Sequence, residues 1–143
     1  MKTLDKINLT ERIESLKAGL WGGLAVLGTF CLVTIANSTI GGQPEIDAWV
    51  SVAIRSAIAL LSGFLFGVTY RYAIRNDRNP HLKSGVVFAF GLVRGLAQVD
   101  GALDGTSAPL FVGVWAIESV LLFAIASKLL DWAIDRHWVE PLR

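Results

Sequence analysis

The sequence predicts an all-α integral membrane protein with four transmembrane helices in one compact bundle. Of its 143 residues, 53% are hydrophobic and 17% are charged, and the mean hydropathy is +0.54, which is too apolar for a soluble domain of this size. Four segments approach the roughly 20 helical residues needed to cross a hydrocarbon core about 30 Å thick. These spans run over approximately 18–37, 49–70, 84–100 and 110–130 within a single membrane domain, 1–143.

The distribution of basic residues predicts the orientation of these spans. Lysine and arginine near the ends of membrane helices stay on the cytoplasmic side. Eleven of the 13 basic residues lie before the first span, between the second and third, or at the C-terminal end, whereas the loops STIGGQPEID and DGALDGTSA contain none. Both chain termini and the middle loop are therefore expected inside, in agreement with an even number of spans.

The first span, AGLWGGLAVLGTFCLVTIAN, carries no charge and follows a segment that contains both acids and bases. This pattern is typical of a retained anchor rather than a cleaved secretion signal. The preceding NLTERIESL begins with Asn8, a good helix cap. Large apolar residues then recur on one helical face at Leu9, Ile13, Leu16 and Leu20. We expect a short amphipathic helix that leads into the span.

The second and third spans each contain one charged side chain, Arg55 and Arg94 respectively. Helical periodicity places Arg94 on a stripe of small and polar residues, which are Ser84, Gly91, Gly95 and Gln98. The opposite face carries Val86, Phe90 and Val93. Arg94 is therefore expected to face protein rather than lipid.

The fourth span, PLFVGVWAIESVLLFAIASKLL, brings one acidic residue, Glu118, into the same region. Counting 1.5 Å per residue from the outer helix ends places Arg55, Arg94 and Glu118 at similar depths of roughly 7 to 12 Å. An unpaired charge in a membrane helix costs several kcal/mol. We therefore expect Arg94 to pair with Glu118 and Arg55 to lie near the same carboxylate. Gln98 and Asp100 complete this predicted polar cluster.

Three interpretations of the polar cluster remain open. The first is a structural group of ion pairs that fixes helix packing. The second is a hydrated site for an anion or a carboxylate, because two arginines and one glutamate leave an uncompensated positive charge. In the third, Glu118 is neutralised by an arginine and ligates the magnesium of a chlorophyll.

Three pairs of glycines have the GxxxG spacing that lets membrane helices approach closely. They are Gly19 and Gly23, Gly63 and Gly67, and Gly91 and Gly95. Contacts within one bundle are the simpler explanation, and a dimer or partner surface is the alternative.

The connection between the second and third spans is the most basic in the chain, with Arg71, Arg75, Arg78 and Lys83. We expect this inner loop to meet acidic lipid headgroups, with an acidic partner surface as the alternative. The C-terminal segment KLLDWAIDRHWVEPLR mixes Trp132 and Trp138 with charge, which predicts an amphipathic helix leaving the bilayer through its headgroup region. Asp131 and Asp135, one helical turn apart, are expected on its solvated face.

Residue patterns of known enzyme chemistry are missing from the sequence. No nucleophile and base arrangement, phosphate loop or dinucleotide fingerprint occurs, and DGALDG lacks the ligand spacing of an EF-hand. The two histidines, His81 and His137, do not suggest a shared metal. We expect a non-enzymatic protein without a metal site or a nucleic-acid partner.

The segment TYRYAIRNDRNPHLKSGVVFAFGLVRGLAQVD, residues 69–100, resembles small multi-span membrane proteins of cyanobacteria and chloroplasts. In these proteins a basic inner loop with an NP turn leads into a FGLVRGLA span. The resemblance implies a thylakoid or cyanobacterial plasma-membrane protein that serves photosynthetic complexes as an accessory or assembly subunit, with other membrane proteins or its own copies as partners. The alternative is an oligomeric small-solute or anion channel or carrier, with Arg55, Arg94 and Glu118 as its polar site.

Overall fold

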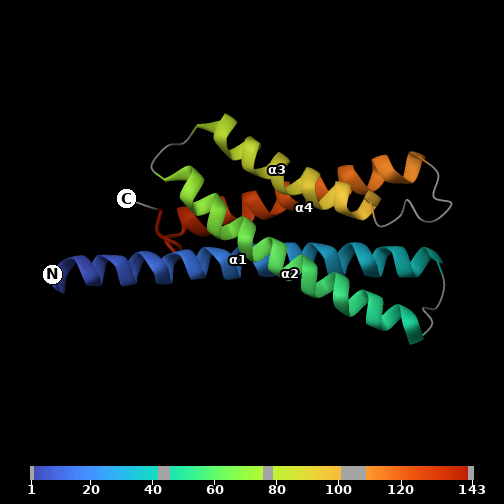
Figure 1. Ribbon diagram of the computed structural model, residues 1–143, viewed down its shortest axis with the longest axis horizontal. Coiled ribbons are helices and arrows are strands. Elements are labelled where there is room, and N and C mark those ends of the chain that lie inside the picture. Colours follow the sequence, from blue (N-terminus) through green and yellow to red (C-terminus); the bar gives the residue numbers. More distant parts are fainter. Residues whose placement is uncertain (1, 42–45, 76–78, 101–108, 142–143) are drawn as a thin grey trace.

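The computed structural model describes residues 2–41, 46–75, 79–100 and 109–141, and within them the chain is all-helical. The four helices are α1 (Lys2–Gly41), α2 (Ile46–Ile74), α3 (Pro80–Asp100) and α4 (Pro109–Asp135). Figure 1 shows them running back and forth along one long axis. The start of α1, the end of α2, the start of α3 and the end of α4 lie at one end, called here the Arg71 end; the opposite end is the Arg94 end.

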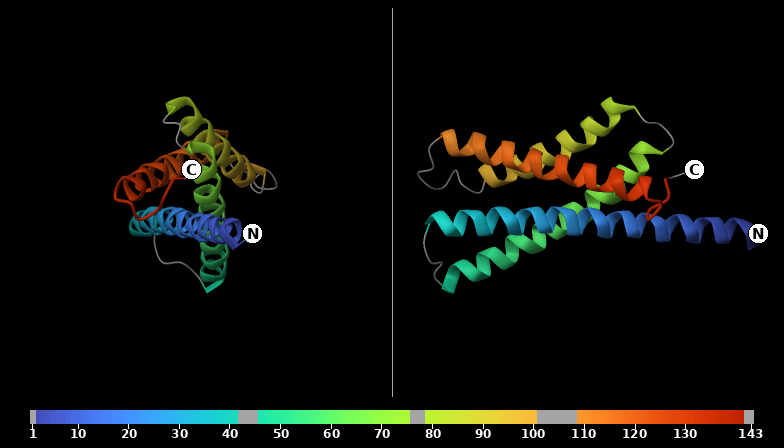
Figure 2. Two further views of the ribbon diagram at one scale, coloured as in Figure 1. Left: turned by 90° about the vertical axis from the view of Figure 1, so that its left-hand side faces the viewer. Right: turned by 180° about the vertical axis from the view of Figure 1, so that it is seen from behind.

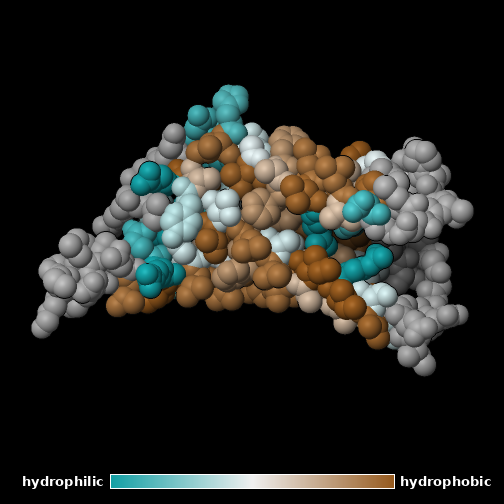
Figure 3. All heavy atoms as spheres, viewed as in Figure 1, coloured by the Kyte–Doolittle hydropathy of each residue, from teal (hydrophilic) through white to brown (hydrophobic). Residues whose placement is uncertain are grey.

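Three helices contain segments long and apolar enough to cross a membrane, namely Leu9–Ala36, Trp49–Ile74 and Pro80–Asp100. Large apolar side chains are exposed along all four helices, and Figure 3 shows hydrophobic surface over most of the coloured part of one face. Such exposure is unfavourable in water and favourable in lipid. The predicted all-helical class is confirmed, and three of the predicted spans fall within these segments or overlap them.

Glycines bring α1 and α2 together. A Cβ atom at Gly67 would collide with the backbone oxygen of Ala18, and one at Gly63 would lie 2.7 Å from both the oxygen of Gly22 and the Cβ of Val26. Because lipid offers no hydrophobic driving force between helices, such close backbone approach stabilises the pair by van der Waals contact. α1 and α2 therefore form one tight hairpin.

The second hairpin, α3 with α4, is built in the same way. A Cβ atom at Gly91 would lie 2.7 Å from the Cα of Val120, and one at Gly95 would lie 2.7 Å from the Cα of Ala116. Figure 2 shows α2 crossing α1 and α3 crossing α4, with the two hairpins as the two layers of the bundle. Each of the three predicted glycine pairs thus makes contacts inside this chain; Gly19 and Gly23 face Phe64 and Leu60 of α2.

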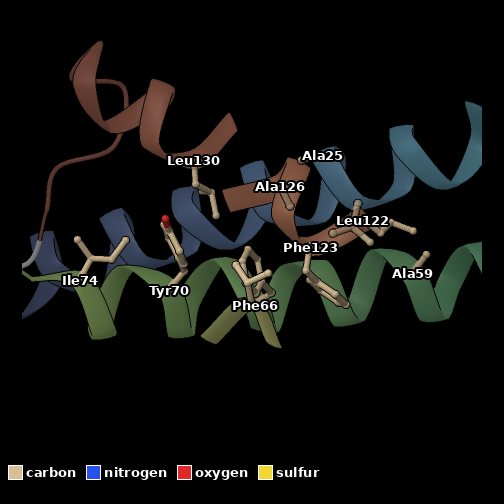
Figure 4. Packing of buried hydrophobic residues seen from close by; sticks show 11 residues of the cluster. Ala25, Ala59, Phe66, Tyr70, Ile74, Leu122, Phe123, Ala126 and Leu130 are labelled. Atoms are coloured by element: carbon tan, nitrogen blue, oxygen red, sulfur yellow. The ribbon is translucent and has the colours of Figure 1, made fainter. Parts of the chain in front are cut away.

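The two layers meet over an aromatic core. Phe66 is fully buried, and its ring centre lies 5.0 Å from that of Phe123 and 5.5 Å from that of Phe90. Tyr70 continues the stack at 5.3 Å from Phe66. Figure 4 shows Phe66, Tyr70 and Phe123 among the smaller buried residues Ala25, Ala59, Ile74, Leu122, Ala126 and Leu130. The middle of the bundle is therefore filled with apolar side chains.

One face of α3 differs from the prediction. Val86 and Phe90 were expected opposite the protein-facing stripe, but both pack against the aromatic core. Of that predicted face, Val93 alone is highly exposed, at 70%. In a membrane protein the surroundings are as apolar as the core, so the position of an apolar residue on a helix does not by itself reveal which side it faces.

The predicted amphipathic lead-in before the first span is not a separate helix. α1 begins at Lys2 and continues for 40 residues, so Asn8 lies inside the helix and not at its start. Neither Gly nor Pro occurs between Lys2 and Ala18, and the chain has no helix breaker there. At 1.5 Å per residue α1 is about 60 Å long, twice the thickness of a hydrocarbon core. Figure 2 shows it projecting past the other helices at the Arg71 end.

The C-terminal segment also differs from the prediction, because α4 stops instead of continuing outward. His137 adopts a left-handed conformation with φ 57°. Its N–H donates to the carbonyl of Ile134 at 2.9 Å, and the N–H of Trp138 donates to the carbonyl of Ala133 at 3.0 Å. This pair of bonds is the Schellman ending of a helix, in which the left-handed position is usually glycine. Because this position holds a histidine and not the usual glycine, the end of α4 was not predictable from the sequence.

After this turn the chain folds back onto the bundle. Trp138 stacks on Trp21 with ring centres 5.2 Å apart and meets Trp132 edge-on at 4.9 Å. The next residue, Val139, is fully buried. The expectation that the C-terminal helix continues beyond Asp135 is therefore wrong, and residues 138–141 form a strap across the Arg71 end.

Candidate functional site

Polar side chains gather on either side of the aromatic core. At one end the Arg71 cluster comprises Glu11, Glu14, Ser15, Arg71 and the backbone of Glu140. On the other side the Arg94 cluster comprises Arg55, Ser62, Arg94 and Glu118. Both draw on the segments Leu9–Ala36, Trp49–Ile74 or Pro80–Asp100, in which charge is expensive to bury.

Every nitrogen of the Arg71 guanidinium donates a hydrogen bond. Nε donates to the carbonyl of Glu140 at 2.8 Å, and Nη1 donates to Ser15 Oγ at 2.7 Å and to the Glu11 carbonyl at 3.2 Å. Nη2 forms an ion pair with Glu11 Oε2 at 3.2 Å. Arg71 is only 2% exposed, so these partners replace water almost completely.

Glu14 fastens the C-terminal strap from the other side. Its Oε2 accepts a hydrogen bond from the backbone N–H of Glu140 at 2.9 Å, and its Oε1 pairs with Lys17 at 2.6 Å. Both backbone groups of Glu140 are thus used, one by Arg71 and one by Glu14. The strap is held by polar bonds at the same end at which Trp21 and Trp138 hold it by stacking.

Asp131 links the remaining helices at this end. Its Oδ1 accepts hydrogen bonds from Tyr70 Oη at 3.0 Å and from Lys83 Nζ at 2.8 Å, which joins α2, α3 and α4. The prediction of a solvated face is wrong for Asp131, which is paired, whereas Asp135 is exposed. Asp131 thus accepts hydrogen bonds from Tyr70 and Lys83, and the sequence pattern had predicted neither contact.

The structure places the residues of the predicted inner basic loop in different environments. Arg71 belongs to α2 and is buried, and Lys83 belongs to α3 and is paired. Arg75 is exposed at the end of α2, and Arg78 lies outside the described residues. Arg75 alone of the described members stays available to lipid headgroups or a partner.

The acidic partners of Arg71 had a signal in the sequence. Glu11, Glu14, Ser15 and Ala18 recur at helical spacing on the face opposite the apolar stripe. The structure turns this polar face inward and leaves the stripe outside, with Leu9, Ile13, Leu16 and Leu20 each more than half exposed. In a soluble protein the orientation would be the reverse, and lipid outside the bundle explains it.

Arg94 is bound much more loosely than Arg71. Its Nη1 donates one long hydrogen bond to Ser62 Oγ at 3.4 Å, and its Cζ lies 5.9 Å from the ring centre of Phe30. Its Nε is buried without a hydrogen-bond partner among the described residues. Ser62 and Phe30 belong to the first hairpin, so Arg94 reaches from α3 across the junction between the layers.

The predicted ion pair between Arg94 and Glu118 does not form within the part of the chain that the structure describes. Glu118 attracts Arg94 and Arg55 repels it, so Arg94 lies within electrostatic reach of both. Direct contact is prevented because the Arg94 guanidinium is directed to Ser62 and Phe30 on the opposite hairpin. The two residues are near each other, as a shared depth requires, but the direction of the Arg94 side chain was not predicted.

The other members of the predicted cluster are at its margin. Arg55, Gln98 and Asp100 are all exposed, whereas Glu118 and Arg94 are partly buried. Figure 3 shows hydrophilic surface between the two layers toward the Arg94 end. The cluster is thus exposed at Arg55 and partly buried at Arg94.

Within the described residues, no group of three or more His, Cys, Asp and Glu side chains is placed to hold a metal ion. Comparison with protein-family models, curated proteins and solved structures found no match for this chain. What the two clusters do must therefore be argued from their geometry.

Proposed function

We propose that the chain is a four-span membrane protein with both ends inside, and that it acts as a non-enzymatic accessory or assembly subunit of a larger membrane complex. The fourth span is α4, whose 27 residues give a length of about 40 Å. An inside Arg71 end agrees with the concentration of basic residues near it.

The observation that carries the accessory role is the filled centre of the bundle. Phe66, Tyr70, Phe90 and Phe123 separate the Arg71 cluster from the Arg94 cluster. An apolar plug between two polar ends provides no hydrated path for a solute through one chain. A small protein with a sealed interior acts through its surface, which favours a partner-binding role. The resemblance of residues 69–100 directs the search for partners to photosynthetic complexes of thylakoid or cyanobacterial membranes.

Topology is tested by labelling single cysteines placed at Ser38 and Ser107 in a Cys31→Ser background. Ser107 lies outside the described residues, and the two positions belong to the sequence segments STIGGQPEID and DGALDGTSA, which contain no basic residue. A membrane-impermeant maleimide should label both from the outer face and should label a cysteine at Arg75 only after permeabilisation. Inner-face labelling of either serine position would remove the four-span arrangement.

The accessory role is tested by tagging the chain and resolving mildly solubilised membranes on native gels. The protein should migrate with a larger complex whose abundance falls when the gene is deleted. Re-expression of the wild type should restore that complex. Migration only as a free monomer, with all complexes unchanged in the deletion strain, would contradict the role.

A second candidate, the oligomeric anion channel or carrier, is favoured by one observation. Arg55 is exposed on α2 beside the incompletely bonded Arg94, so a neighbouring copy could complete a polar path between subunits. Purified protein in liposomes should then conduct anions, and Arg55→Gln should reduce the flux. Absence of flux from protein shown to be oligomeric would dismiss this candidate.

A further inference from the structure

We propose that Arg55 and Arg94 together bind an oxyanion, the phosphate ester of an anionic phospholipid headgroup, at the Arg94 end of the bundle. This site does not depend on the accessory role and requires only that the chain spans a membrane. Free phosphate shares the same chemistry, and the experiment below distinguishes the two sources.

The first argument is the charge balance of the Arg94 cluster. Arg94 lies within electrostatic reach of both Arg55 and Glu118, and the three side chains sum to one positive charge. No direct ion pair among these three is formed in the described structure. An excess positive charge at this depth is stabilised by an anion that joins the group.

The second argument is the unused hydrogen-bonding capacity of Arg94. A guanidinium has five N–H donors in a planar fork, which matches the oxygens of phosphate in pairs. Arg94 uses one donor in the bond to Ser62, and its buried Nε has none. The Arg94 Cζ also lies 5.9 Å from the ring centre of Phe30, which holds the guanidinium beside the first hairpin. The side chain is therefore positioned and incompletely bonded.

The third argument identifies the lipid as the source of the oxyanion. Arg55 is exposed, and its neighbours Ile54 and Ile58 are exposed by more than half, so the charge emerges from an apolar surface. Arg55 lies six residues past Trp49, about 9 Å along α2, within the reach of a long side chain extending toward the headgroups. A molecule with an anionic head and apolar tails fits both parts of this surface.

The test uses native mass spectrometry of the full-length protein in detergent with equal amounts of phosphatidylglycerol and phosphatidylcholine. The wild type should retain phosphatidylglycerol preferentially. Arg55→Gln and Arg94→Gln should each reduce that preference about tenfold, the effect of losing a charge-assisted hydrogen bond. Arg12→Gln, which removes an exposed arginine from α1 near the Arg71 end, is the matched control and should leave the preference unchanged.

Three outcomes decide the matter. Equal retention of the two lipids by the wild type overturns the proposal without any variant, so a poorly folded variant cannot hide a failure. A preference that survives both Arg55→Gln and Arg94→Gln overturns the assignment to these residues. Inorganic phosphate that displaces phosphatidylglycerol from the wild type, and that raises the melting temperature of the wild type but not of Arg55→Gln, supports the site with free oxyanion as its source.

Discussion

Arg71 and Arg94 are the same residue type in the same kind of helix, and the structure treats them in opposite ways. Arg71 is 2% exposed and donates four hydrogen bonds, one of them in an ion pair. Among the described residues, Arg94 donates one bond of 3.4 Å and has a buried Nε without a partner. A fully bonded charge fixes a structure, whereas an incompletely bonded one is available to bind something else.

The two arginines differ because the chain places different numbers of hydrogen-bond partners near them. Arg71 receives partners from the first turns of α1 and from the strap after α4, which surround it. Arg94 receives only Ser62 at close range, with Glu118 farther away. The contrast between the two arginines can be tested by replacing each of them and by changing the packing that positions Arg71.

The largest effect is expected from Arg71→Met. The substitution leaves the Glu11 carboxylate, Ser15 and the Glu140 carbonyl without their donor in a buried place. Removing one member of such a group costs about 3 to 5 kcal/mol of unfolding free energy. Reversible unfolding in mixed micelles measures it, with Arg12→Met as an exposed control expected within about 0.5 kcal/mol of the wild type. A loss below about 1 kcal/mol would contradict the structural role of Arg71.

The next effect concerns Gly67, one helical turn before Arg71. Its contact with Ala18 draws α2 onto α1 and so brings Arg71 to Ser15. Gly67→Ala forces the two backbones apart and should cost about 1 to 3 kcal/mol. Gly28→Ala is the matched control, because nothing lies within 4 Å of the added methyl group. Helix propensity alone makes that control neutral or slightly stabilising, and equal effects of the two substitutions would show that the close contact is unimportant.

The smallest effect is expected from Arg94→Met, which loses one long hydrogen bond and relieves an incompletely compensated charge. The cost should be at most about 1 kcal/mol, well below that of Arg71→Met. A double-mutant cycle with Glu118→Gln should give a coupling below about 0.5 kcal/mol, whereas the cycle of Arg71 with Glu11 should exceed it. A larger coupling energy between Arg94 and Glu118 would show that the two side chains do form the direct ion pair.

Helices and their close contacts were predictable because their signals are local. An apolar stretch such as 49–70 predicts a span by its length, and Gly63 with Gly67 predicts close approach by its spacing. Counting residues also placed Arg94 and Glu118 at a common depth. The rotation of a helix about its own axis is set by packing against its neighbours. Counting residues along the chain carries no information about that packing. The expected ion pair between Arg94 and Glu118 does not form for this reason.

The Arg71 cluster could not be predicted because its partners come from distant parts of the chain. Ser15 and Glu140 precede and follow Arg71 by 56 and 69 residues. The strap that supplies Glu140 depends on a left-handed His137, an uncommon residue in that position. Basic residues near Arg71 also suggested a loop, although the helix continues to Ile74.

The strap at Glu140 also has a consequence for the order of events during synthesis. Glu140 is made after all four helices, so Arg71 and Glu14 enter the bilayer before the backbone groups that bind them exist. The glycine contacts of α1 with α2 are complete in sequence much earlier. Closure of the Arg71 end therefore requires that translation has passed α4. A chain interrupted before Glu140 lacks the strap partners of Arg71 Nε and Glu14 Oε2, whereas the ion pairs of Arg71 with Glu11 and of Glu14 with Lys17 need no part of the strap.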